Sequence, residues 1–369
     1  MYEPALAVGK VIEVFQEYPG ISFIRVEIPG EEPSRAVNYN YLTGRVKEGD
    51  TVILNTTAVR LGLGTGGYHF VYLNLGDREG LAEDFLSGIE DRFVRANLSA
   101  SAGHIMKLRY TPLQFRILAL EEEDSPCHEV IRAFESLEGK PVILLPLHSL
   151  LAPLAITFKN FYPEKRLVYI MTDGACLALE FSNLVRQLAE EGFLAATITY
   201  GNAFGGDYET VNIFTALAAA VEVLAADLIV VGMGPGIVGT STRYGFSGVE
   251  LAFIEKAVRI LKGRSILIPR VSFADKRERH YGISQHTITL LDELITDPVE
   301  AAFPENDYIR KRLAGYGLED RHVLAFYPIE EIKEILEGST FPFHSMGRSF
   351  EDDPLFFITA GLAVYRVQG

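Results

Sequence analysis

The part of the chain with the clearest chemical potential is a glycine-rich run followed by hydroxyl side chains, residues 232–242. Its centre matches the pattern GxGxxG, in which glycines let backbone N–H groups approach an anion closely. The hydroxyl groups and the arginine that follow would add further donors. We therefore expect this run to bind an anionic group. The ligand-binding residues that it contributes are Gly234, Pro235, Gly236, Gly239, Thr240, Ser241, Thr242 and Arg243.

The same run partly matches two known phosphate-binding motifs, and it could also be a structural turn. It has the spacing of a P-loop, but Thr240 stands where that motif has its lysine, which excludes a P-loop. A dinucleotide-binding loop would be followed by an acidic residue about 20 positions later. The next predicted strand ends instead at Arg270, which could meet a phosphate. As a structural turn, the run would precede a helix with Ser247 and Glu250 as its capping box.

Carboxylates and a histidine near other predicted strand ends supply candidates for acid–base chemistry. Asp173 follows one strand and precedes a helix, where a carboxylate can cap backbone donors, contact a ribose or a metal, or act as a base. Asp207 ends a glycine-rich run and either caps the next helix or contacts the ligand. We predict Asp173 and His280 as catalytic residues, and Gly174, Asp207 and Arg270 as further ligand contacts.

A basic cluster stands out in this acidic chain and could attract an anionic ligand. It consists of Arg270, Lys276, Arg277, Arg279 and His280. His280, His286 and His148 are all expected near one sheet edge, so they could form a metal site or an acid–base pair. No HExxH or HxH spacing supports a metal. We therefore predict no metal site, and the sequence names no cofactor.

Residues from 141 onward alternate between apolar strands and helical stretches, which predicts the element that positions these side chains. Strands are expected at 141–146, 166–171, 194–199, 227–232 and 265–269, and helices at 149–160, 176–191, 208–225 and 247–262. Repeated β–α–β units form a parallel sheet with helices on both faces. The predicted fold class is therefore α/β, with a Rossmann-like three-layer sheet domain. Its ligands should bind beyond the carboxyl ends of the strands.

The residues before this domain predict short strands separated by turns. The strands are expected at 9–15, 21–28, 36–41, 51–55 and 68–73, with one more at 110–120. They indicate a small N-terminal β-barrel or β-sandwich module. A polar break at 121–126 places the boundary between a module of residues 1–122 and an α/β domain of residues 123–369. Near the C-terminus, a polar loop beginning at His344 precedes an apolar strand expected over 355–367.

Composition narrows the classes of partner. Subtracting 49 acidic from 34 basic residues gives a net charge of −15, which would repel a polyanion and excludes nucleic acid as an expected partner. The longest apolar stretch, 214–231, is interrupted by Glu222 and Asp227, so we expect no membrane span. Cys127 and Cys176 form no metal-binding or disulfide pattern, and the first residues lack a secretory signal. We expect a cytoplasmic location, and a homo-oligomer stays open.

Two motifs carry a resemblance to a known family. The chain resembles an uncharacterised bacterial family marked by a DGGALP-like and a GPGxVGTGT-like segment, which stand here at 173–178 and 234–242. The segment 104–110 and the overall length agree with that family as well. Departures from its motifs occur at Ala175, Cys176, Ala178 and Ser241. The resemblance covers nearly the whole chain and implies no known activity.

These observations lead to one functional hypothesis and one alternative. The α/β domain is expected to bind a small anionic ligand, either nucleotide-like or phosphorylated, across the loops that contain Asp173 and residues 234–242. Turnover of that ligand is left open, because no complete set of catalytic residues is visible. The alternative is a non-catalytic regulatory or scaffold protein in which the N-terminal barrel is an interaction module.

Overall fold

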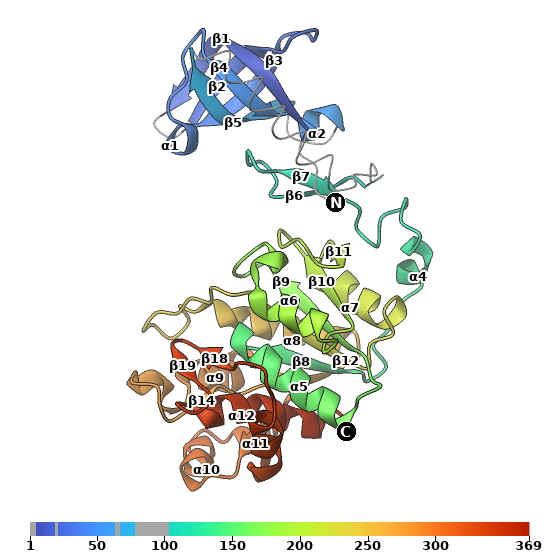
Figure 1. The fold of residues 1–369 in the computed structure, drawn as a ribbon, viewed down its shortest axis with the longest axis vertical. Helices are drawn as coiled ribbons and strands as arrows, with labels where there is room; N and C mark the ends of the chain where they lie inside the picture. Colours follow the sequence, from blue (N-terminus) through green and yellow to red (C-terminus); the bar gives the residue numbers. More distant parts are fainter. Residues whose placement is uncertain (1–4, 19–20, 63–66, 78–102, 369) are drawn as a thin grey trace. The chain divides into compact units, whose positions relative to one another are not determined.

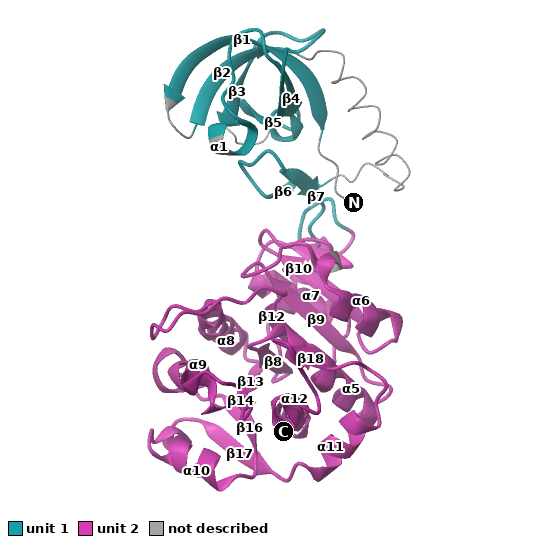
Figure 2. Ribbon diagram, turned by 60° about the vertical axis from the view of Figure 1, so that its left-hand side comes forward, with its two compact units in different colours: residues 1–125 teal, residues 126–369 magenta. Residues whose placement is uncertain are grey.

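The chain forms two compact units, residues 1–125 and 126–369, which are described one by one below (Figure 2). The structure is a computed structural model, and it describes residues 5–18, 21–62, 67–77 and 103–368.

The first unit contains a closed five-stranded barrel in the order β1-β2-β3-β5-β4 (Figure 1). Strands β3 and β5 are parallel, and the other neighbours are antiparallel. This order is that of the OB-fold, a small Greek-key barrel. The predicted N-terminal barrel is therefore confirmed. The strands are β1 (Leu6–Tyr18), β2 (Ile21–Glu27), β3 (Ser34–Tyr39), β4 (Thr51–Asn55) and β5 (Tyr68–Gly76).

Alternation of side chains explains why these residues form a barrel. In β2, Ile24 and Val26 are buried while Arg25 and Glu27 are exposed, which is the two-residue period of a half-buried strand. The buried side chains pack on Val52 and Leu54 of β4. The strand expected at 110–120 is much shorter than predicted. The remaining elements of this unit are α1 (Asn40–Thr43), α2 (Thr57–Arg60), β6 (Ile105–Lys107) and β7 (Phe115–Ile117), the last two forming a hairpin.

The second unit is built on an eight-stranded sheet in the order β11-β10-β9-β12-β8-β13-β16-β17. All seven neighbouring pairs are parallel. The predicted α/β, Rossmann-like fold class is therefore confirmed. The strands are β8 (Pro141–Leu145), β9 (Leu167–Thr172), β10 (Ala196–Tyr200), β11 (Tyr208–Thr210), β12 (Leu228–Met233), β13 (Arg264–Leu267), β16 (Glu300–Pro304) and β17 (Val323–Tyr327).

Helices cover the sheet on both faces, so the central strands are apolar throughout. Every residue of β8, β9 and β12 is buried. The crossovers from β8 to β9 and from β12 to β13 run in opposite directions along the sheet. Because such crossovers are right-handed, their helices α5 and α8 lie on opposite faces. Helices α11 and α12 contact α5, and α7 contacts α8 (Figures 1 and 2).

The helices and minor strands complete the second unit. The helices are α4 (His128–Arg132), α5 (Leu151–Phe161), α6 (Asn183–Glu190), α7 (Ile213–Glu222), α8 (Glu250–Ile260), α9 (Gln285–Thr289), α10 (Asp307–Ala314), α11 (Glu330–Glu337) and α12 (Pro354–Leu362). The two-residue strands β14 (Val271–Ser272) and β15 (Gly282–Ile283) form one hairpin, and β18 (His344–Ser345) and β19 (Arg348–Ser349) form another. None of the helices in the described ranges is long and apolar enough to span a membrane.

The expected strand at 355–367 is wrong, because this segment forms helix α12 and a following 3-10 turn. The helix is buried on nearly all sides, so its apolar residues show no helical period, and a run of this kind cannot be distinguished from a buried strand by its pattern. Pro354 at the start of the helix fits the helical assignment, since the first turn needs no N–H from that residue.

Two predicted helices begin later than expected, which changes the position of Asp207. The helix expected at 208–225 is strand β11 followed by α7, whose N-cap is Asn212 rather than Asp207. The helix expected at 176–191 begins only after its N-cap, Ser182. In both cases a side-chain cap fixes the first turn, and the residues before it stay in a loop or a strand at the sheet edge.

Close packing of three helices generates a prediction at Gly361 of α12. A Cβ atom there would lie 2.4 Å from Cγ2 of Ile332 in α11 and 2.8 Å from Oγ1 of Thr157 in α5. We expect Gly361→Ala to lower the free energy of unfolding by about 1–2 kcal/mol despite the better helix propensity of alanine. Denaturant unfolding measures this. Gly315→Ala, where the nearest atom is 3.5 Å away, is the matched control and should be nearly neutral. Equal stability of both variants would contradict the close packing.

Candidate functional site

The strand order places a topological switch point at the carboxyl ends of β9 and β12. These two strands are neighbours, but the chain leaves β9 toward β10 and leaves β12 toward β13, on opposite sides. The two connections therefore run in opposite directions along the sheet, as they do at the ligand-binding switch point of open α/β sheets. They contain the two sequence motifs, residues 173–178 and residues 234–242. We call the region in which these two loops meet the crevice.

Backbone contacts bring the two motif loops together. The N–H of Cys176 donates to the carbonyl of Pro235 at 3.0 Å. A Cβ atom on Gly234 would lie 2.8 Å from Sδ of Met171 and 3.1 Å from the carbonyl oxygen of Cys176. Gly236 has a φ of +107°, a backbone angle that residues with a side chain rarely adopt. Glycine is thus required at 234 for close approach and at 236 for the direction of the chain.

The second motif loop presents backbone and hydroxyl donors. The N–H groups of Gly236 and Ile237 have no hydrogen-bond acceptor among the described residues. Oγ1 of Thr240 and Oγ1 of Thr242 lie 2.7 Å apart on the exposed tip, which is closed by a bond from the N–H of Thr240 to the carbonyl of Gly245. Unpaired N–H groups of a glycine loop and nearby hydroxyls suit an anion.

Arg243 of this loop is already paired. Its Nη2 lies 2.5 Å from Oε1 of Glu293, and the hydroxyl of Tyr244 donates to the same carboxylate at 2.7 Å. The side-chain hydrogen bond to Glu293 raises the pKa of Arg243. An anion could recruit this exposed guanidinium only in competition with Glu293.

Two carboxylates stand on the β9 side of the crevice. Oδ2 of Asp173 accepts the N–H of Asn202 at 3.0 Å, which ties the loop after β9 to the loop after β10. Oε1 of Glu250 accepts the hydroxyl of Thr172 at 2.6 Å. A Cβ atom on Gly174 would lie 2.3 Å from Oε2 of Glu250, so the predicted contact Gly174 makes room for that carboxylate.

Glu250 is a functional candidate that sequence reasoning missed. Burial raises the pKa of Glu250 to about 7, opposed by the hydrogen bond from Thr172 and reinforced by the charge of Asp173. A carboxyl group that exchanges its proton near neutral pH can act as a general acid or base. The capping-box interpretation is wrong, since the N-cap of α8 makes no side-chain bond and the carboxylate points to Thr172. The available signal was its position, at the end of a glycine-rich βα loop.

His280 and Arg270 belong to a different group of side chains, beyond β13. His280 is buried, its Nδ1 lies 2.8 Å from Oγ of Ser284, and its Nε2 accepts from Nε of Arg279 at 3.1 Å. Burial and the charge of Arg270 lower the pKa of His280 to about 3. No contact between described residues joins His280 to Asp173. The structure thus separates the two predicted acid–base residues.

Asp207 lies at the edge of the sheet rather than in the crevice. Its Oδ2 accepts the N–H of Thr197 at 2.8 Å and the hydroxyl of Thr197 at 2.9 Å. Its own N–H donates back to that hydroxyl. These bonds attach the start of β11 to β10, so Asp207 has a structural task that accounts for its position.

His148 contacts residues next to the crevice. Its Nε2 lies 2.7 Å from Oγ of Ser182, and its Nδ1 lies 3.3 Å from the hydroxyl of Tyr169. That hydroxyl also donates to the carbonyl of Gly232 at 3.1 Å. Burial lowers the pKa of His148 to about 4, so the imidazole is neutral at pH 7. Within the described ranges, no three His, Cys, Asp or Glu side chains are grouped to hold a metal ion.

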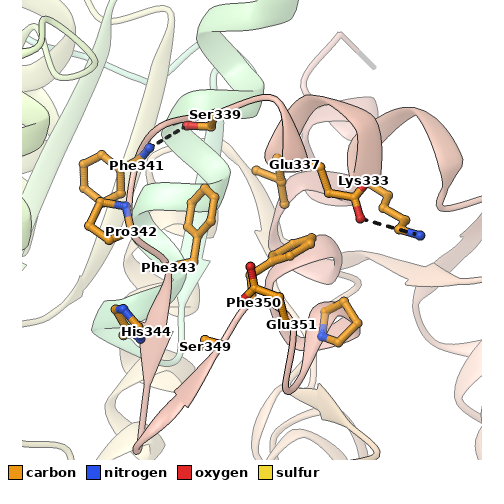
Figure 3. Close-up of a pocket in the computed structure, with 12 residues that line it drawn as sticks. Lys333, Glu337, Ser339, Phe341, Pro342, Phe343, His344, Ser349, Phe350 and Glu351 are labelled. Carbon is orange, nitrogen blue, oxygen red and sulfur yellow. Dashed lines mark hydrogen bonds and ion pairs between the residues drawn. The ribbon is translucent and has the colours of Figure 1, made fainter.

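A separate cavity of about 500 Å³ lies between α11, the β18–β19 hairpin and the start of α12. Phe343 and Phe350 form part of its wall, and the ion pair of Lys333 with Glu337 lies at its border (Figure 3). Its lining includes His344 of the predicted polar loop but none of the predicted site residues. The crevice and this cavity are therefore different features.

The protein is therefore of a class in which a five-stranded barrel is followed along the chain by a parallel α/β unit with a topological switch point. The family described as "Protein of unknown function (DUF3866)" matches residues 35–364, which is most of the chain. The chain belongs to this family, as its resemblance to an uncharacterised family predicts. The match runs from β3 of the barrel into the last turn of the second unit. No curated protein and no solved structure matches the chain.

The raised pKa of Glu250 generates a prediction for stability. Because the folded state binds this proton more tightly, stability contributed by the group is present below pH 4.5 and is lost as pH rises to about 7. We expect Glu250→Gln to increase the free energy of unfolding above pH 7 by about 1–3 kcal/mol. The gain should vanish below pH 4.5, as denaturant unfolding at several pH values can show.

The matched control is Glu190→Gln at the exposed end of α6, which changes the net charge equally. It should leave stability nearly unchanged at every pH. A gain at Glu250→Gln that is independent of pH, or a loss above pH 7, would contradict the burial of an ionisable carboxyl group there.

Proposed function

We propose that the crevice between β9 and β12 binds a small anionic ligand that is nucleotide-like or phosphorylated. The observation that carries this proposal is the meeting of the two motif loops at the switch point, with the N–H groups of Gly236 and Ile237 free of acceptors among the described residues. In the proposed complex these groups and the hydroxyls of Thr240 and Thr242 donate to the anionic group.

The carboxylate of Asp173 gives the proposed binding site a second polar group, separate from the anion-binding loop. A carboxylate opposite an anion-binding loop accepts hydrogen bonds from hydroxyl groups, such as those of a ribose. Hydrogen-bond donors in the loop and an acceptor at Asp173 together favour a ligand with an anionic group at one end and hydroxyl groups at the other. The overall charge of −15 does not oppose it, because the donors are local and fixed by the backbone.

If the ligand is turned over, we propose Asp173 and Glu250 for the acid–base steps. Glu250 has the better tuned proton affinity, since its pKa is raised to about 7 by burial. His280, the other residue predicted from the sequence, is buried among Ser284, Arg279 and His286 and has no such access.

A cytoplasmic location is part of the proposal. It is supported by Cys127 and Cys176, which are both free rather than joined in a disulfide.

An interaction role for the barrel is the second candidate function. Phe15 of β1 is 39% exposed, and its ring centroid lies 6.4 Å from that of Phe23 in β2. The ring of Tyr68 lies 5.7 Å from Phe23 and carries the guanidinium of Arg35 at 4.5 Å. Phe23 and Tyr68 are half-buried, so the cluster is partly exposed, and a partly exposed aromatic cluster favours contact with a partner.

Ligand binding is tested by calorimetry and thermal shift of the whole protein against nucleotides, dinucleotides and sugar phosphates. We expect Thr242→Val and Arg243→Ala to weaken binding about tenfold each, the loss expected for one hydrogen bond to a charged group. Glu293→Gln should strengthen binding, because it releases Arg243 from its 2.5 Å pairing. If all three variants bind like the native protein, the anion site is not at this loop. A screen without any ligand would favour the interaction role of the barrel.

Turnover is tested on whichever compound binds. Asp173→Asn and Glu250→Gln should abolish turnover while changing the dissociation constant by less than about tenfold, because each removes a proton-transfer group rather than an anion donor. Asp207→Asn, at the sheet edge, is the matched control and should keep full activity. Binding without turnover in the native protein would identify a sensor rather than an enzyme.

A further inference from the structure

A second space adjoins the glycine loop on the side away from β9. It is a cavity of about 20 Å³ under the loop, beyond the carboxyl ends of β8 and β13. Its apolar wall is formed by Leu147, Ile237, Phe246 and Leu290, and its polar lining includes Arg270 and His286. We call it the subloop cavity. Ile237 belongs to its wall, whereas a Cβ atom on the preceding Gly236 would lie 3.9 Å from Cβ of Ala175 in the crevice.

Arg270 and His286 of the subloop cavity each have an unsatisfied side-chain nitrogen. Nε of Arg270 and Nε2 of His286 are buried and have no hydrogen-bond partner in the described part of the chain. The side chain of Arg270 is only 7% exposed. Leaving a buried charged donor unpaired is costly, so an oxygen acceptor at this point would stabilise the fold.

The surroundings fix these two groups in place. The imidazole of His286 stacks on Phe246 with ring centroids 4.0 Å apart, and a Cβ atom on Gly239 would lie 2.8 Å from its Cε1. The backbone N–H of Arg270 donates to Oγ1 of Thr287 at 3.0 Å, and its carbonyl accepts from the N–H of Ser284 at 2.9 Å. These bonds join helix α9 to the residues that follow β13, and Arg270 and His286 both line the subloop cavity.

The charge around the subloop cavity is positive. Asp275 is shared by Arg270 at 2.8 Å, Arg277 at 2.8 Å and Arg348 at 3.5 Å, and Arg348 also reaches Asp353 at 3.1 Å. Three guanidinium groups therefore face two carboxylates. Burial lowers the pKa of Arg270 to about 10, so it keeps its charge at neutral pH. An anionic oxygen would balance the excess.

The volume decides what can enter. A water-sized group needs about 10–15 Å³ of such space, so the subloop cavity of about 20 Å³ admits one oxygen atom and not a whole phosphate. From these observations we propose that the subloop cavity is an oxyanion subsite, which receives one oxygen of a phosphoryl or carboxylate group between Arg270 and His286. This deepens the proposed function and rests on it, because it assigns the anionic end of the ligand to one side of the glycine loop.

The subsite is tested with inorganic phosphate and with acetate on the whole protein. Nitrogen-detected NMR of the eight histidines reports on His286, whose signals are assigned by their loss in His286→Leu. Burial, together with the charges of Arg270, Arg279 and Arg277, lowers its pKa to about 4, and His280 packs against its ring. We expect phosphate to shift the His286 signals and raise this pKa, because a bound anion favours the imidazolium. A stronger response to phosphate than to acetate identifies a phosphoryl group, and the reverse identifies a carboxylate.

Variants then separate the subsite from the crevice. His286→Leu should weaken phosphate binding about tenfold, whereas His344→Leu, an exposed histidine outside the subloop cavity, should not. No response of any histidine signal of the native protein to either anion overturns the subsite, and this outcome needs no assignment if His286→Leu fails to fold. If a nucleotide-like ligand binds and His286→Leu leaves its affinity unchanged, the subsite is wrong and the crevice proposal stands. If phosphate shifts His286 but no larger ligand binds, the subsite stands and the proposed function is wrong.

Discussion

The parallel pairing of β9 with β12 is the constraint on which the rest of the site depends. Its register sets Thr172 opposite Met233, so the residues after them, Asp173 and Gly234, leave the sheet side by side. The two crossovers run in opposite directions, which makes this point a topological switch point of the sheet. The two loops meet there through the bond from the N–H of Cys176 to the carbonyl of Pro235. Glycine at 234 follows from this pairing, since Met171 and the Cys176 carbonyl leave no room for a Cβ atom.

Negatively and positively charged side chains lie on different sides of the glycine loop. The net charge of the chain does not show this local arrangement. Two carboxylates, Asp173 and Glu250, stand on the β9 side, and three guanidinium groups surround Asp275 beyond β13. Between them the loop contributes backbone N–H groups, whose direction is fixed by the fold and needs no charged side chain. A ligand with an anionic end and a hydroxyl-bearing end matches this gradient better than a uniformly charged one.

Several polar groups near the loop are buried at a cost to the stability of the fold. Burial of Glu250 raises its pKa to about 7, and burial of His286 lowers its pKa to about 4, so burial disfavours the charged form of both groups. Arg270 leaves a buried nitrogen without a partner among the described residues. Native proteins tolerate such exceptions mainly at functional sites, where strain and desolvation serve binding or catalysis. Glu250, His286 and Arg270 all lie beyond the carboxyl ends of the strands.

The sequence by itself determined the elements whose side chains repeat with a regular period. Alternation in β2 and the apolar runs of β8, β9 and β12 predict the barrel and the parallel sheet, and a glycine run after a strand predicts a loop at the sheet edge. Only the tertiary structure decided that residues 355–362 are helical, because a segment buried on all sides has no period to read. It alone directed Glu250 to Thr172 and brought His286 beneath Gly239. Periodicity shows which face of an element is buried. The contacts of Glu250 and His286 instead join residues far apart in the chain, and strand order and helix packing decide which of those residues meet.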